Sequence, residues 1–353
     1  MSETPFPPDR YARLTDDLGR LAGGAGPSVL LQAEAVVALE ALAHGIGRSE
    51  RPVLSIESSR YGRLTSAWLR AAGAPVTVLD LPDGEPADPD RVDALLRAAP
   101  ATAAVLLTQA EVLTGVAHPV DDIAAVAHRH GAAVAVDAVA AVGGLAAPRG
   151  ADAVVIGPQK ALGGPAGLSV ATLSDRGWAL LDRQDDTYAS TLNLPYLRRA
   201  AAESAAAGAL PGTPSVPELA AAERAVAAVE AEGIEARIAR HHATRAAVRA
   251  GLLAAGLTPW VADERHASPL ATTVAVPSGV AARDLAWRAA AAGGHWVAGD
   301  TTPRGAYLRV SHYGRHATLA RALGELVALT HAAGADTGAA AQAAADAWLA
   351  AAP

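Results

Sequence analysis

The chain has 353 residues, enough for one large domain and a smaller one. It contains no cysteine, which excludes disulfides, cysteine-ligated zinc and thiol catalysis. Its net charge of −7, without any basic run, argues against nucleic-acid binding, and no apolar run has the length of a membrane span. The N-terminal sequence MSETPFPPDR lacks the features of a signal peptide. We therefore expect a cytoplasmic protein with no nucleic-acid, membrane or metal partner.

Short apolar runs alternate with alanine-rich helical stretches from residue 27 onward, after a segment (1–26) that is polar and then rich in glycine. We expect strands at 28–32, 51–57, 74–81, 102–109, 132–140, 151–159 and 167–173, and helices at 34–47, 63–73, 89–100 and 120–131. Short apolar strands that alternate with helices are typical of a mostly parallel sheet covered by helices. The pattern predicts an α/β large domain over 27–234, whose ligands bind at the carboxyl ends of the strands.

The regular alternation ends in the stretch 190–218. One long helix is expected at 217–256, followed by strands at 271–277 and 307–314 and helices at 281–293 and 316–334. This order predicts a smaller C-terminal α/β domain over 235–335. The alanine-rich tail, 336–353, has low complexity, and we expect it to be a helix or a frayed end without function.

Lys160 is the only lysine of the chain, so 28 of the 29 lysine and arginine residues are arginines. Arginine can replace lysine where only a positive charge is needed, but its guanidinium stays protonated and is a poor nucleophile. A lysine amine, in contrast, can lose its proton and form an imine with an aldehyde. Lys160 lies in the turn GPQKALGGPAG (157–167) between two expected strands. It is therefore a candidate Schiff-base residue, and the alternative is a solvated loop lysine.

Asp137 ends a run of small apolar residues in the sequence AVAVDAVAAVGG. A buried aspartate at such a position needs a partner. A protonated pyridine nitrogen is one such partner, and this pair lets a pyridoxal ring act as an electron sink. A turn or helix-capping aspartate is the alternative. Because Asp137 and Lys160 both come just after apolar runs of expected strands, they are placed at the same edge of the sheet.

Several motifs in the same order resemble the class V aminotransferases, in the alanine–glyoxylate aminotransferase branch. They include VDAVAAVGG (136–144), GADAVVIGPQKALGGPAGLSVATLSDRGW (150–178), EVLTGVAHPVDD (111–122), GTPSVPEL (212–219) and YLRVSHYG (307–314). The resemblance covers roughly residues 28–330. It implies the fold type I architecture with a mostly parallel seven-stranded sheet, a pyridoxal 5′-phosphate or related vitamin B6 cofactor, and a homodimer with the active site at the subunit interface.

The resemblance also implies roles for individual residues. Lys160 would be the imine lysine and Asp137 the partner of the ring nitrogen, while Arg309 would hold the substrate carboxylate. The cofactor-binding residues would be Tyr61 and Val139 on the two faces of the ring, Gln159 beside the lysine, Thr114, Glu34, and Thr213 from the other subunit. Without the resemblance, Tyr61 could equally be a core aromatic and Arg309 a surface residue of a strand.

Glu34 stands where the family carries a Gly/Ser/Thr-rich turn that binds the cofactor phosphate at a helix N-terminus. A carboxylate there competes with a phosphate for the same N–H groups and repels it. The segment resembles the pyridoxamine–pyruvate aminotransferase group, in which a glutamate takes this place and unphosphorylated pyridoxamine or pyridoxal is a substrate. The alternative is that Glu34 only caps the helix.

Two further departures concern the substrate pocket. The family's N-terminal Pro-Gly-Pro segment is missing, and Asp300 stands where relatives carry a second arginine, with Arg304 nearby as a substitute. We expect a transaminase that uses an unphosphorylated B6 compound and a small 2-oxo acid/amino acid pair such as pyruvate/alanine. The alternatives are a conventional PLP-dependent aminotransferase or lyase and a catalytically silent binding scaffold. The histidines, including His241 and His242, are interpreted as helix surface.

Overall fold

The computed structural model describes residues 6–24 and 26–351. Its larger part is built on a seven-stranded sheet in the order β1-β7-β6-β5-β4-β2-β3. The strands are β1 Ser28–Leu31, β2 Val53–Glu57, β3 Val76–Asp80, β4 Ala104–Thr108, β5 Ala133–Asp137, β6 Ala153–Ile156 and β7 Ser169–Leu173. β2 to β6 pair in parallel, whereas β7 runs antiparallel to both β1 and β6. The predicted mostly parallel seven-stranded sheet is therefore confirmed.

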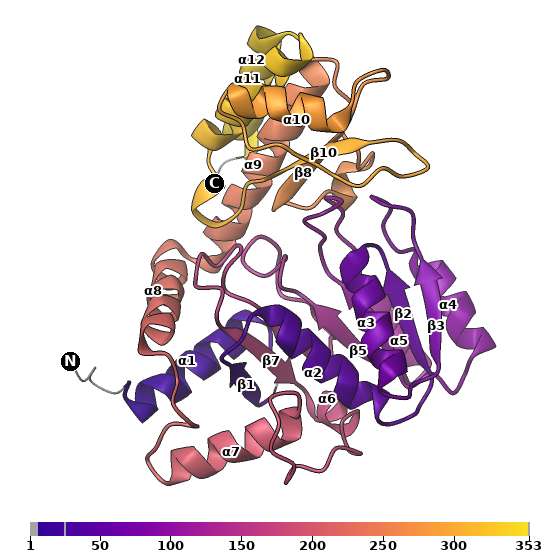
Figure 1. Cartoon of the computed structure of the whole chain (residues 1–353), viewed down its shortest axis with the longest axis vertical. Helices are drawn as coiled ribbons and strands as arrows, with labels where there is room; N and C mark the ends of the chain where they lie inside the picture. The colour runs from indigo at the N-terminus through magenta and orange to yellow at the C-terminus, as the bar shows by residue number, and fades with distance from the viewer. Residues whose placement is uncertain (1–5, 25, 352–353) are drawn as a thin grey trace.

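Helices cover both faces of this sheet because alternate strand residues point to opposite sides. Val134 and Val136 pack into one apolar cluster, and Ala133 and Ala135 pack into another. The helices of this part are α1 Pro8–Leu21, α2 Ala35–Gly47, α3 Arg60–Ala71, α4 Pro89–Ala98, α5 Val120–Arg129, α6 Asp175–Ala179 and α7 Leu194–Ala206. In Figure 1, α2 and α3 lie in front of the sheet. Residues of both helices line the cavity described in the next subsection.

Helix α1 lies in the N-terminal segment, for which no helix was predicted. It begins with a proline in its first turn and buries Tyr11, Leu14 and Leu18, which are spaced for one helix face. These side chains join the same apolar cluster as α4 and α5. The segment is thus part of the core and not merely a polar leader to it.

The smaller part contains the antiparallel sheet β8-β10-β9. Its strands are β8 Ala271–Ala275, β9 Val297–Ala298 and β10 Tyr307–Ser311, and its helices are α9 Ile234–Ala254, α10 Ala282–Ala291, α11 Leu319–Ala333 and α12 Thr337–Ala351, with short 3₁₀ turns at Glu264–His266 and Gly314–His316. Figure 1 shows this part stacked above the carboxyl edge of the large sheet, with α8 (Val216–Glu232) running up to it along one side. No helix among the described residues is long and apolar enough to cross a membrane.

Two predictions for this region need correction or refinement. The single helix expected at 217–256 is wrong, because Gly233 adopts φ +84° and separates α8 from α9. The alanine-rich tail is an ordered helix, α12, which packs against α9 and α11. Ala340 and Ala344 are fully buried there, because their small side chains allow close helix packing.

Candidate active site

The predicted pair Asp137 and Lys160 meets at one cavity above the carboxyl edge of the large sheet. Asp137 is the last residue of β5, and Lys160 lies in the turn that follows β6. The cavity is open to solvent, and its empty volume is about 420 Å³. Its polar lining consists of Glu34, Tyr61, Thr108, Glu111, Asp137 and Lys160, and its apolar lining includes Leu39, Val112 and Val139. The topology therefore brings together residues from five separate segments of the chain.

Asp137 is half-buried, and one of its two carboxylate oxygens accepts a hydrogen bond. Its Oδ1 accepts a hydrogen bond from the Val139 N–H at 3.0 Å, and no described residue donates to Oδ2. Burial raises the pKa of Asp137 to about 6, against the Val139 N–H and the Lys160 charge, which lower it. A protonated ring nitrogen facing Oδ2 would supply the missing cation, so this carboxyl fits the pyridine of a B6 compound.

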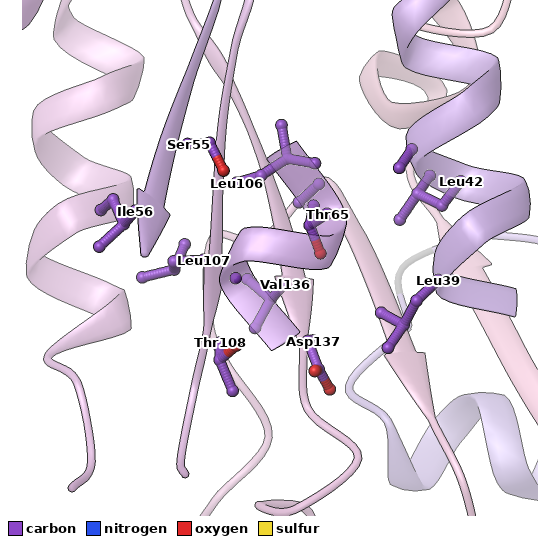
Figure 2. A pocket seen from close by; sticks show the side chains of 13 residues that line it. Leu39, Leu42, Ser55, Ile56, Thr65, Leu106, Leu107, Thr108, Val136 and Asp137 are labelled. Carbon is purple, nitrogen blue, oxygen red and sulfur yellow. The ribbon is translucent and has the colours of Figure 1, made fainter. Parts of the chain in front are cut away.

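A second, mostly apolar pocket of about 370 Å³ adjoins the site cavity, and Figure 2 shows Thr108 and Asp137 at one end of it. It lies between the central strands and helices α2 and α3, and shares Leu39, Thr108 and Asp137 with the site cavity. Leu106 and Val136 are among its apolar walls. The Asp137 carboxylate therefore has little polar material behind it, which explains why burial dominates its pKa.

Lys160 is half-buried and forms no ion pair with any residue that the structure describes. Its Nζ lies 5.8 Å from the centroid of the Tyr313 ring. Burial lowers the pKa of the Lys160 amine, while the carboxylates of Asp137, Glu34 and Glu111 oppose this effect. A lowered pKa places more of the amine in the neutral, nucleophilic form, as an imine-forming lysine requires.

Two arginines of α9, neither of them predicted, bind backbone carbonyls near the site: Arg237 holds the turn that carries Lys160, and Arg240 holds the loop after β10. Arg237 Nη1 donates to the carbonyls of Ala161 and Leu162 at 2.9 and 3.0 Å. Arg240 Nη1 donates to the Gly314 and Ala317 carbonyls, both at 2.9 Å.

Both guanidiniums also pair with one carboxylate, Glu232, at 2.8 and 2.6 Å. Helix α9 thus connects the Lys160 turn to the loop after β10. In the sequence, the only sign of this arrangement is that Arg237 and Arg240 are three residues apart on one helix. That spacing does not show which carbonyls they reach.

The prediction that the histidines of α9 lie on the helix surface is wrong. His241 is completely buried, and His242 is half-buried. His241 Nδ1 lies 2.7 Å from the Arg237 carbonyl, and its Nε2 accepts the Gly314 N–H at 2.9 Å. Burial lowers the pKa of both histidines to about 4, so they are neutral. His241 thereby joins α9 to the loop that follows β10.

Tyr61 and Val139 line the same cavity, as a ring-binding pair requires. Tyr61 lies in the first turn of α3, where the Ser59 hydroxyl accepts its N–H at 3.1 Å. The guanidinium of Arg60 lies 5.2 Å from its ring centroid. These contacts fix an aromatic ring at the cavity wall, where it can stack on a planar ligand.

Glu34 occupies the N-cap position of α2, yet its side chain makes no capping hydrogen bond. The side chain is exposed and lines the cavity. Gln159 does not line the cavity, but its Oε1 is buried without a partner among the described residues. A Cβ on Gly157 would lie 2.2 Å from that oxygen and 3.1 Å from Ala35 Cβ, so the amide fits beside the helix start only because residue 157 is glycine.

The other predicted site residues lie outside the cavity lining. Arg309 is half-buried in the middle of β10, and its charge is close enough to contribute to lowering the Lys160 pKa. Thr114 is buried, and its carbonyl accepts the Thr273 hydroxyl at 2.8 Å. Thr213 is exposed. One chain therefore does not bring Thr114 or Thr213 to the cavity.

Arg304 does not replace the missing second arginine. Its guanidinium lies 4.6 Å from the Trp260 ring centroid and donates to the Asp83 carbonyl at 3.0 Å. It is therefore engaged with the 81–88 loop. Asp300 is exposed and places a negative charge near Tyr307.

Glu111 lines the cavity but was not among the predicted site residues. It comes three residues after the apolar strand β4, and Asp137 ends the neighbouring strand β5 at the same edge, so the strand-end pattern could have identified it.

Comparisons with known proteins agree with this geometry. The Aminotransferase class-V family model matches residues 37–311. Pyridoxamine–pyruvate transaminase of Mesorhizobium japonicum is 32% identical, covering 90% of this chain and 82% of the relative. The crystal structure of pyridoxamine–pyruvate aminotransferase from Mesorhizobium loti superimposes with a TM-score of 0.88 at 30% identity, covering 97% of this chain and 89% of that one.

A third relative agrees with the branch expected from the motifs. Alanine–glyoxylate aminotransferase of Rattus norvegicus is 28% identical over 51% of this chain and 45% of its own length. The family resemblance and the fold type I architecture are thus confirmed. A Lys160 amine, an Asp137 carboxylate and a Tyr61 ring around one cavity are what a B6-dependent member requires, and the chain belongs to the class-V aminotransferase family.

Proposed function

We propose that this aminotransferase transfers an amino group between a small amino acid/2-oxo acid pair and an unphosphorylated B6 compound held at Lys160. The observation that carries the proposal is the uncapped Glu34 side chain, which lines the cavity at the start of α2. A matching assignment comes from the relative named pyridoxamine–pyruvate transaminase.

The residues of the chain divide the chemistry among them. The B6 ring, when bound, supplies an electron sink for the carbanion of the amino acid. Lys160 Nζ, whose pKa burial lowers, would take the proton from the donor carbon and deliver it again in the second half of the transfer. Asp137 would keep the ring nitrogen protonated, and Tyr61 and Val139 would enclose the ring. Arg309 orients the carboxylate of the amino or oxo acid.

Glu34 separates this proposal from conventional PLP chemistry. A phosphate at the start of α2 would lie within a few ångströms of the Glu34 carboxylate, and such a pair costs roughly 1–4 kcal/mol at effective dielectrics of 80 to 20. A neutral 5′-hydroxymethyl group would instead donate a hydrogen bond to the carboxylate. A conventional PLP aminotransferase or lyase is the second candidate, supported by the class-V family match.

The choice of amino or oxo acid depends on the guanidinium that binds its carboxylate, which we assign to Arg309. Because Arg304 is bound to the Asp83 carbonyl and Asp300 is acidic, we assign the substrate carboxylate to Arg309, whose charge acts on Lys160. A monocarboxylate such as pyruvate satisfies this arrangement better than a dicarboxylate. We further propose a homodimer, in which the exposed Thr213 of one chain completes the cavity of the other.

An absorbance titration with pyridoxal and with pyridoxal phosphate tests the proposal on the wild type, Glu34→Ala and Lys160→Ala. We expect the wild type to bind pyridoxal more tightly and Glu34→Ala to reverse the preference. Lys160→Ala should lose the band of the lysine-bound aldehyde with both compounds. Equal affinity of the wild type for both compounds would favour the conventional PLP enzyme, and no band with either would favour a silent scaffold.

A further inference from the structure

A chain of three buried side chains ends on Glu111, a carboxyl that the chemistry above does not use. Glu111 is 1% exposed and lines the same cavity as Lys160 and Asp137. Its Oε1 accepts the Ser58 hydroxyl at 2.9 Å, and Ser58 Oγ lies 3.0 Å from His118 Nε2. Ser58 and His118 are also buried, so no solvent competes for these hydrogen bonds.

The hydrogen bonds all donate toward Glu111, because the chain of bonds begins at a backbone N–H, which can only donate. The Ala87 N–H donates to His118 Nδ1 at 3.0 Å, so a neutral imidazole carries its proton on Nε2 and donates it to Ser58. Burial lowers the pKa of His118 to about 4, which keeps the ring neutral. The Ser58 proton is then directed at Glu111 Oε1.

Glu111 shares its cavity with an excess of carboxyls. The charged or titratable groups around it are Lys160, Asp137, Glu34, Arg309, Tyr61 and His118. Burial raises the pKa of Glu111 to about 7, and the Asp137 charge acts in the same direction. The Glu111 charge in turn raises the Lys160 pKa. The ionisation of the two groups is therefore linked.

We propose that Glu111 is a second proton-holding group of the site, that its ionisation adds to the control of how readily Lys160 releases a proton, and that Ser58 and His118 hold it in position. The linkage is a property of the chain itself. Its consequence for turnover rests on the proposed function, because only there does Lys160 transfer protons.

The single lysine makes a direct measurement possible. Biosynthetic incorporation of [ε-¹³C]lysine labels Lys160 alone, so one NMR resonance reports its ionisation in the full-length protein. Glu111→Gln should lower the Lys160 pKa, because a neighbouring negative charge is lost. It should also remove an inflection near pH 7 that the wild-type resonance shows when Glu111 titrates. Ser58→Ala should move that inflection to higher pH, since the carboxylate loses a donor.

Glu325→Gln is the matched control, because Glu325 is equally buried, at 2% exposure, but lies in α11 beside Arg321. It should leave the Lys160 titration unchanged. A Lys160 pKa and inflection that are the same in Glu111→Gln as in the wild type would overturn the proposal. If Glu111→Gln does not fold, an unmoved inflection in Ser58→Ala would do so. Addition of pyridoxal to the wild type tests the proposed function separately, since failure to shift the resonance would contradict only that.

Discussion

At the residue scale, the role proposed for Lys160 is one that the 28 arginines of the chain could not take over. Its partly buried amine has a lowered pKa, whereas a guanidinium in the same place stays protonated. Lys160→Arg should therefore keep the positive charge and the fold but lower kcat by at least about 10³-fold and abolish the pyridoxal absorbance band. Steady-state kinetics and a pyridoxal titration measure this.

A control for Lys160→Arg adds a lysine elsewhere. The side chain of Arg149 is 92% exposed, so the double variant Lys160→Arg/Arg149→Lys carries one lysine outside the cavity. It should bind pyridoxal no better than Lys160→Arg. Recovery of the band in the double variant would show that position is unimportant.

Asp137 predicts a pH dependence of stability in the B6-free protein. Its folded-state pKa of about 6 lies above its ordinary value of 3.8, so between these two pH values the native state holds more protons than the unfolded state. Its contribution to the free energy of unfolding is therefore present at low pH and lost as the pH rises to about 6. Asp137→Asn, which cannot ionise, should gain about 1–3 kcal/mol relative to the wild type over this range. Urea denaturation at pH 4 and pH 7 checks the sign; a constant difference would contradict it.

At the scale of elements, Gly233 decides how α9 leaves α8. Its φ of +84° and ψ of 135° suit glycine alone, although a Cβ there would meet no atom within 4 Å. Gly233→Ala should therefore destabilise the protein by about 1–3 kcal/mol through backbone strain alone. It should also loosen the contacts of Arg237 with the carbonyls after Lys160. Chemical denaturation measures the first effect, and the rate of pyridoxal binding measures the second.

Gly324 is the matched control for this element. It lies inside α11, has open space around its Cβ position, and lacks a positive φ. Gly324→Ala should stabilise the protein by about 0.5–1 kcal/mol, because alanine favours a helix. A similar loss of stability in both variants would mean that the backbone of Gly233 is not the cause.

At the scale of the whole molecule, a shared active site predicts complementation between two defective chains. Lys160→Ala removes the amine from a chain's own site, and Thr213→Arg would damage the site of the other chain. A mixed dimer then has one site with both lesions and one site with neither. Refolding the two variants together should restore about a quarter of wild-type activity, since half of randomly formed dimers are mixed. If each site used the Thr213 of its own chain, the mixture would stay inactive.

The site residues found from the sequence are those announced by local signals. Asp137 follows an apolar strand, and Lys160 is unique in a glycine-rich turn. The strand and helix periods predicted the large sheet, because side-chain alternation is set by neighbours in the chain. Glu111 carried a similar strand-end signal, but its partner Ser58 lies 53 residues away in sequence.

Only the tertiary structure decided how these segments work together. It buried His241 between Arg237 and Gly314, turned Arg304 towards Asp83, and packed the tail helix α12 onto α9. The sequence by itself determined the fold class and singled out Lys160 and Asp137 as candidate site residues, because periodicity and residue chemistry are local properties. Which carboxyl, carbonyl or guanidinium meets which across the cavity depends on contacts between distant segments, and no local pattern records them.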